Sequence, residues 1–153
     1  MDSLYLGLKF LHYLSMALWI AAALQLTGKL RALSNDPGPD NPAFKSGPGG
    51  AGIFGHLGAA GILATGVGLI VWSGGMGAVP WPIHLALTLA LGLWGLLAFA
   101  DRGLASVHGA IASGDANPDA LKGRLGSLRM MTVGFHMGWT AILVLMVWRN
   151  VIA

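Results

Sequence analysis

The 153-residue sequence contains no cysteine. This absence excludes disulfides, thiolate metal sites and a cysteine nucleophile, and it leaves the redox compartment of the protein undetermined. Charged side chains are also scarce, because Asp, Glu, Lys and Arg together make up 10% of the chain, against about a quarter in soluble domains. The motifs GxSxG, HExxH and the Walker-type phosphate loop are missing as well. The sequence therefore carries no hydrolytic or nucleotide-binding signature.

Hydrophobic residues, in contrast, account for 55% of the chain. They gather in four runs, at 4–26, 51–72, 81–100 and 130–148. Each run is long enough to cross a hydrocarbon layer, which takes about 20 residues of helix. We predict an all-α fold, an integral membrane up-down-up-down bundle of four helices. The bundle forms a single transmembrane domain over residues 1–153, with helices at about 4–26, 51–72, 81–100 and 118–149.

The connections between the runs differ in length and composition. Residues 28–50 are rich in Gly, Pro, Asn and Asp, which predicts a loop. Residues 73–80 are uncharged and predict a tight turn on the opposite membrane side. Asn117 followed by Pro118 predicts the N-cap and first position of the last helix. The first run exceeds the length of a signal-peptide core and follows Asp2, so we expect a retained helix.

Basic residues are distributed unequally between the two membrane sides. We name the side that holds residues 28–50 and 101–117 side B, and the opposite side A. Seven of the nine basic residues lie on side B: Lys29, Arg31, Lys45, Arg102, Lys122, Arg124 and Arg129. The positive-inside rule places side B in the cytoplasm and both termini in the periplasm or outside. With a net charge of only +3, these residues indicate topology and not a nucleic-acid surface.

Four histidines fall inside the apolar runs: His12, His56, His84 and His136. At 1.5 Å per residue, His12 and His84 lie about 12 Å and about 5 Å from side A, whereas His56 and His136 lie about 8 Å and about 9 Å from side B. Helices one and three are diagonal neighbours in such a bundle, as are helices two and four. The sequence therefore predicts one histidine pair at each of two depths.

Paired imidazoles from facing helices are the axial ligands of b-type haem. We therefore predict one or two haem b groups and transmembrane electron transfer, with a single haem held by one histidine and water as a variant. Thr132 and Thr140 stand at i−4 and i+4 of His136 and are expected to orient its ring. Arg129 lies at the side B surface, where it would meet a haem propionate.

Two other function classes remain open, and so does the question whether the chain is an enzyme. A copper transport or binding protein would use imidazole and thioether ligands, which Met16 near His12 and Met137 beside His136 supply. A noncatalytic membrane anchor or assembly subunit would use the histidines structurally. The expected partners are membrane lipid, a quinone, and redox subunits or a second copy of the chain, with no nucleic acid.

Some polar and small residues receive no cofactor role from the sequence. His108 follows the third apolar run and is expected to be solvated. Asp101 stands next to Arg102 and is not assigned to a proton relay. The glycines of 52–68 leave shallow helix faces, which suit either close helix packing or a flat cofactor.

Three segments resemble the CopD/HemJ-like superfamily of small bacterial membrane proteins. They are LKFLHYLSMALWIAAALQLTGKLRAL, with His12, Trp19 and a basic exit; LATGVGLIVWSGG, with Thr65 and Gly66; and WPIHLALTLALGLWGLL. They are similar to the first, second and third helices of that superfamily, so the resemblance covers most of the chain.

The resemblance implies a four-helix membrane fold. HemJ-type members bind haem and are linked to protoporphyrinogen oxidation, and CopD-type members are linked to copper uptake. In HemJ-type proteins a first-helix histidine binds haem, and this role carries over to His12. Their third helix has an essential lysine shortly after a tryptophan, where this chain has His84 after Trp81. The resemblance therefore implies haem binding and not protoporphyrinogen oxidation.

Overall fold

The computed structural model describes residues 3–47, 52–114 and 117–152, with side chains described as far as residue 148. Its helices are α1 (Ser3–Asn35), α2 (Pro42–Lys45), α3 (Gly52–Trp72), a short 3-10 helix η1 (Met76–Ala78), α4 (Trp81–Ser113) and α5 (Pro118–Ile152). No strand occurs in the described part of the chain. The fold is therefore all-α.

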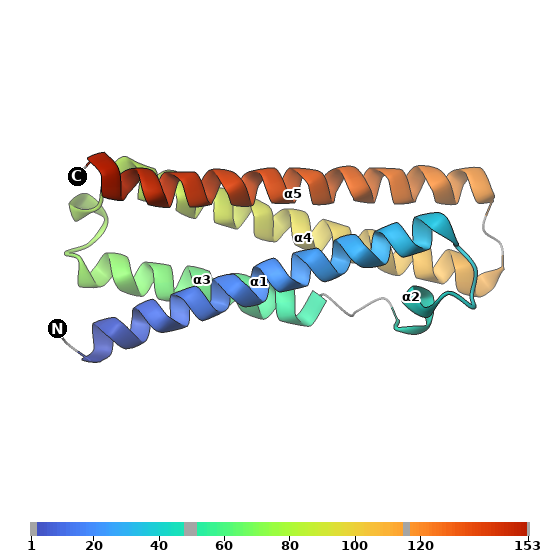
Figure 1. Ribbon diagram of the computed structural model, residues 1–153, viewed down its shortest axis with the longest axis horizontal. Helices are drawn as coiled ribbons and strands as arrows, with labels where there is room; N and C mark the ends of the chain where they lie inside the picture. The colour runs from blue at the N-terminus through green and yellow to red at the C-terminus, as the bar shows by residue number, and fades with distance from the viewer. Residues whose placement is uncertain (1–2, 48–51, 115–116, 153) are drawn as a thin grey trace.

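The four long helices pack into one antiparallel bundle, in which consecutive helices run in opposite directions (Figure 1). The helix α1 packs against α3 and α5, and α4 packs against the same two helices. Both chain ends lie at one end of the bundle, and α2 lies toward the other (Figure 1). All four long helices are apolar and long enough to cross a membrane. This confirms the prediction of an all-α membrane four-helix bundle.

Three of the helices are longer than the membrane requires. The helices α1 and α4 have 33 residues each and α5 has 35, whereas α3 has 21. At 1.5 Å per residue the longer helices span about 50 Å, against about 30 Å of hydrocarbon. Their extra length lies on side B, where α1, α2, α4 and α5 form an extension of the bundle without α3.

The predicted ends of the first and third helices were therefore too early, and residues 28–35 are helical instead of loop. A hydropathy pattern identifies only the part of each helix that must be apolar because it lies in lipid. Beyond them the helices continue because spaced leucines still find a core, and Leu30, Leu33 and Leu104 are fully buried there. Gly28 does not interrupt α1, since a glycine in a helix costs only about 1 kcal/mol relative to alanine.

The last helix starts at the capping residues that the sequence predicts. Asn117 Oδ1 accepts hydrogen bonds from the backbone N–H groups of Asp119 (2.9 Å) and Ala120 (3.4 Å). Pro118 is the first helical residue, where its missing N–H is not needed.

Aromatic rings fill the contact between α1 and α5 in the middle of the bundle. The buried Trp19 ring meets Phe135 and Trp139 edge to face, with centroid distances of 5.5 Å and 5.0 Å. Such pairs add to the stabilisation from burial alone. The centre of the bundle at this depth is therefore packed with side chains.

Glycines bring α1 and α3 into close contact. At Gly58, an added Cβ would lie only 2.7 Å from the backbone nitrogen of Trp19 and 2.9 Å from its Cα. At Gly61, an added Cβ would collide with the Ser15 side chain. These glycines serve helix packing, which is one of the two uses that the sequence leaves open for them.

Replacing Gly58 by alanine is expected to lower the free energy of unfolding by about 1–3 kcal/mol, because α1 backbone atoms must move to admit the methyl group. Gly134 on α5 is the matched control, since an added Cβ there meets nothing within 4 Å. Gly134→Ala should be neutral or stabilising by up to about 1 kcal/mol through helix propensity. Denaturation in detergent micelles measures both changes, and equal effects would refute the close contact.

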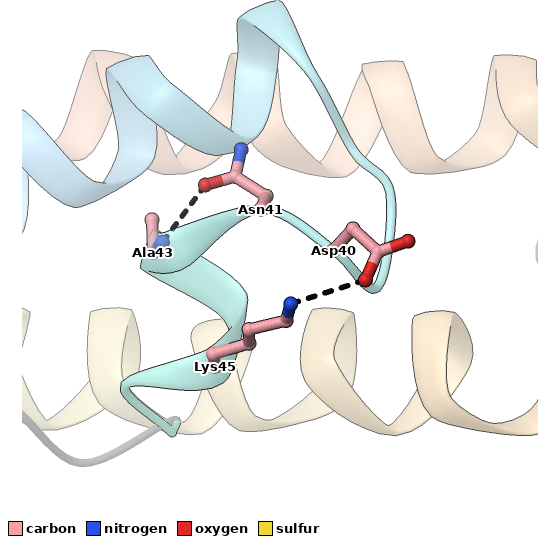
Figure 2. Close-up of polar contacts among 4 residues, drawn as sticks. All are labelled: Asp40, Asn41, Ala43 and Lys45. Carbon is pink, nitrogen blue, oxygen red and sulfur yellow. Dashed lines mark hydrogen bonds and ion pairs between the residues drawn. The ribbon is translucent and has the colours of Figure 1, made fainter.

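Segment 36–47, which we call the strap, folds over the side B extension. Its buried Asn41 donates through Nδ2 to the carbonyls of Ala32 (3.0 Å) and Asp36 (2.6 Å). Asn41 Oδ1 accepts from the backbone N–H of Ala43 at 2.8 Å and thereby caps α2 (Figure 2). One amide side chain thus ties the strap to the end of α1.

Candidate functional site

The four histidines predicted inside the membrane have four different sets of hydrogen-bond partners. These partners determine which ring nitrogen of each histidine carries a proton and which one has an unused lone pair. An iron or copper ion can bind only the nitrogen with the unused lone pair.

His12 on α1 turns toward α3. Its Nδ1 lies 2.9 Å from Thr65 Oγ1, and that hydroxyl donates to the carbonyl of Gly61 at 2.5 Å. The hydroxyl proton is thus in use, so His12 Nδ1–H is the donor and Thr65 the acceptor. The ring is half-buried, and the backbone of Ile62 on α3 is a further hydrogen-bond partner. His12 therefore retains a lone pair on Nε2.

His84 at the start of α4 lies at the side A end of the bundle and is exposed. Its Nε2 is 3.1 Å from the carbonyl of Met76 in η1 and donates to it. The ring thus fastens the turn between α3 and α4. Hydrogen bonds hold His84 against η1 and His12 against α3, so the contacts of this structure do not bring the predicted side A pair together.

His56 on α3 has both ring nitrogens engaged with α4. The indole of Trp94, which can only donate, gives its Nε1–H to His56 Nδ1 at 2.8 Å. His56 Nε2 lies 3.0 Å from Asp101 Oδ2. The ring is therefore neutral, with its proton on Nε2 directed at the carboxylate. His56 has no free lone pair for a metal, and its hydrogen bonds tie it to α4 instead of pairing it with His136.

Asp101 has a structural role that the sequence did not predict. Its carboxylate lies at the first residue of α3, where a Cβ added to Gly52 would come within 2.9 Å of Oδ2. The N-terminus of a helix carries a partial positive charge, which favours a carboxylate there. Trp94 and Asp101 are seven residues apart, which places them two turns apart on one face of α4. This seven-residue spacing is the feature of the sequence that could have indicated a common hydrogen-bond partner for Trp94 and Asp101 on α3.

His136 on α5 is held by its own helix. Its Nδ1 donates to the backbone carbonyl of Thr132 at 2.6 Å. The threonine hydroxyls do not orient the ring as predicted: Thr132 donates to the carbonyl of Arg129 (2.8 Å), and Thr140 donates to that of His136 (2.9 Å). The Arg129 side chain is exposed at side B. His136 therefore keeps an unused lone pair on Nε2.

The space around His136 differs between its inner and outer sides. Toward the bundle interior, the cavity that it lines with Leu97 and Phe135 measures about 10 Å³, room for one water at most. On the outer flank of α5 the ring faces a shallow, open surface that α5 alone lines. We call this the α5 hollow; its other lining residues are Val133, Met137 and Thr140.

His108 is buried, contrary to the prediction that it is solvated. Its exposed fraction is 6%, and its Nδ1 lies 3.1 Å from the carbonyl of Leu104. The ring of Phe44 from the strap stacks on it, with a centroid distance of 5.1 Å and an interplanar angle of 12°. The prediction failed because α4 continues beyond its apolar run and the strap covers it.

Within residues 3–47, 52–114 and 117–152, no group of three or more His, Cys, Asp or Glu side chains is placed to hold a metal ion. Two embedded histidines, His12 and His136, offer a free Nε2, and His136 lies on the open outer flank of α5. No protein-family model, characterised protein or solved structure matches this chain. Function is therefore inferred from the chemistry of these side chains.

Proposed function

We propose that this chain is a membrane protein that binds haem b and transfers electrons across the bilayer, with His136 as the residue that would bind the iron. One observation carries the proposal: His136 Nδ1 donates to the Thr132 carbonyl while the ring lines the α5 hollow. Histidines that bind metals almost always donate their other N–H to a carbonyl or carboxylate, which fixes the ring and raises its basicity.

The α5 hollow suits a flat, mostly apolar group. Val133 and Met137 line it with apolar side chains, and Thr140 and His136 provide the polar atoms. A bound haem would supply one-electron chemistry, and the protein would supply the ligand, its orientation and a low-dielectric surround. The 10 Å³ interior cavity favours this flank over the bundle axis. The proposal is therefore one haem per chain.

His12 is the alternative ligand for the single haem or metal ion. Thr65 holds its Nδ1 and leaves Nε2 free, as at His136. The resemblance to HemJ-type proteins implies haem binding at this histidine. We further propose a quinone or a redox subunit in the bacterial inner membrane as electron partner, with side B in the cytoplasm.

Copper binding is the second candidate, and it also rests on the α5 hollow. Met137 and His136 line that hollow together. Imidazole and thioether are the ligands that suit copper. Haem binding and copper binding predict different metal contents for the purified protein.

Purification from cells supplied with both haem and copper tests the proposal. We expect about one haem iron per chain by pyridine extraction and elemental analysis, with copper well below one per chain. Copper without iron would support the second candidate. Protein free of both metals would leave the noncatalytic anchor or assembly subunit as the remaining function and would refute haem binding.

A further inference from the structure

His108 combines deep burial with an unpartnered nitrogen. Its Nδ1 donates to the Leu104 carbonyl, and its buried Nε2 has no hydrogen-bond partner. Phe44 covers one face of the ring. Phe44 itself packs on the side B extension of the bundle core and belongs to the strap. The contact between Phe44 and His108 thus joins the strap to α4.

This arrangement suits only the neutral imidazole. A neutral ring with its proton on Nδ1 presents a lone pair at Nε2, which costs little to bury among apolar groups. A second proton would create a buried N–H with a full positive charge and no acceptor. The Phe44 ring cannot accept that N–H, because the two rings are nearly parallel at 12° and ring N–H groups lie in the ring plane.

The charged residues on the surrounding elements do not compensate for this charge. They are Lys29 and Arg31 of α1, Asp36, Asp40 and Lys45 of the strap, Arg102 of α4, and Asp119, Lys122 and Arg124 of α5. Asp40 pairs with Lys45, Asp36 accepts from the Gly38 N–H, Lys29 donates to the Gly47 carbonyl, and Arg124 donates to Ser106. No ion pair joins any of these described groups to His108, and most of them are cationic.

We infer that Phe44 and His108 form an acid-sensitive latch that holds the strap on the side B end of the bundle. The docked strap requires neutral His108, so docking is favoured at higher pH and is lost as the pH falls. Release of the strap would expose His108 and the surface under Phe44 to water. The inference does not depend on haem binding.

The absence of native cysteines makes the strap easy to label. Ser46 is exposed on the strap, and a nitroxide attached at Ser46→Cys would report its motion by electron paramagnetic resonance in lipid nanodiscs. We expect a single immobile spectrum at pH 8 and a mobile component at pH 5. In a His108→Gln background the spectrum should be the same at both pH values, because glutamine does not titrate.

Control variants distinguish a pH-dependent change caused by His108 from one with another cause. Asp40→Asn removes the strap's exposed ion pair and should leave the pH response intact. His108→Leu provides a second non-titrating background if the glutamine variant fails to fold, with helix content checked by circular dichroism. A spectrum in the original background that does not change with pH would overturn the latch. An equal change in either His108 variant would also overturn it.

Discussion

Replacement of His136 by alanine is expected to remove the haem absorption of the purified protein. The variant loses the one imidazole that lines the α5 hollow, while the Thr132 carbonyl and the hollow itself remain. Loss of the iron ligand should lower haem occupancy by at least about tenfold, since even the groups that hydrogen-bond to a metal ligand are worth about 10- to 100-fold in affinity. Haem content per chain and the visible spectrum measure the effect.

Added imidazole distinguishes a lost ligand from a misfolded protein. Free imidazole can enter the space that His136→Ala creates and should restore part of the absorption. His108→Gln is the matched control, because it removes a histidine at the side B extension, far from the α5 hollow in sequence and packing, and should keep its haem. Full haem occupancy in the His136→Ala protein would show that the ligand lies elsewhere.

Removal of the Asp101 carboxylate is expected to destabilise the bundle. Asp101→Ala leaves the Nε2–H of His56 without its acceptor and should lower the free energy of unfolding by about 2 kcal/mol, toward the lower end for a charge-assisted hydrogen bond because both side chains retain some solvent contact. In a double-mutant cycle with His56→Ala, the coupling energy should be about 1–2 kcal/mol. Denaturation in mixed micelles measures all four proteins.

The ion pair between Asp40 and Lys45 provides the control cycle. Its N–O distance of 3.1 Å resembles that of the His56–Asp101 pair, but its side chains are 97% and 61% exposed (Figure 2). Such surface pairs contribute about 0–1 kcal/mol, because water and salt screen them. A coupling energy for His56 and Asp101 no larger than that of the control would mean that the pair does not hold α3 to α4.

The bundle was predictable from the sequence because the membrane itself imposes the signal. Lipid requires about 20 consecutive apolar residues, and the four runs show this directly. The ends of α1 and α4 were not predictable in the same way. Beyond the lipid, Leu30 and Leu104 are buried by contacts between helices and the strap, and such contacts leave no continuous run.

The site was predictable only in part, for a related reason. Residue type and depth along a helix follow from the sequence, but the direction of a side chain depends on its neighbours. The carbonyl that holds His136 is a backbone group, which no residue type reveals. His56 is occupied by two α4 side chains, and only the seven-residue spacing of Trp94 and Asp101 hints at them.

The embedded polar groups thus fall into two classes: those that hydrogen-bond to one another, and those that keep a free nitrogen. His56, Trp94 and Asp101 satisfy one another and fasten α3 to α4, and a fully satisfied network of this kind makes a helix contact rigid and specific. His136 keeps a free nitrogen beside an open space. A polar group at a lipid-facing surface is costly unless it is used, and a bound cofactor would use it.

The central claim, that this bundle carries haem b, is tested most directly by a reduced-minus-oxidised visible spectrum of the protein purified from haem-replete cells. We predict a Soret band and a reduced α-band of protein-bound haem b, at a stoichiometry near one haem per chain. A colourless, haem-free but fully helical protein from the same cells would contradict the claim.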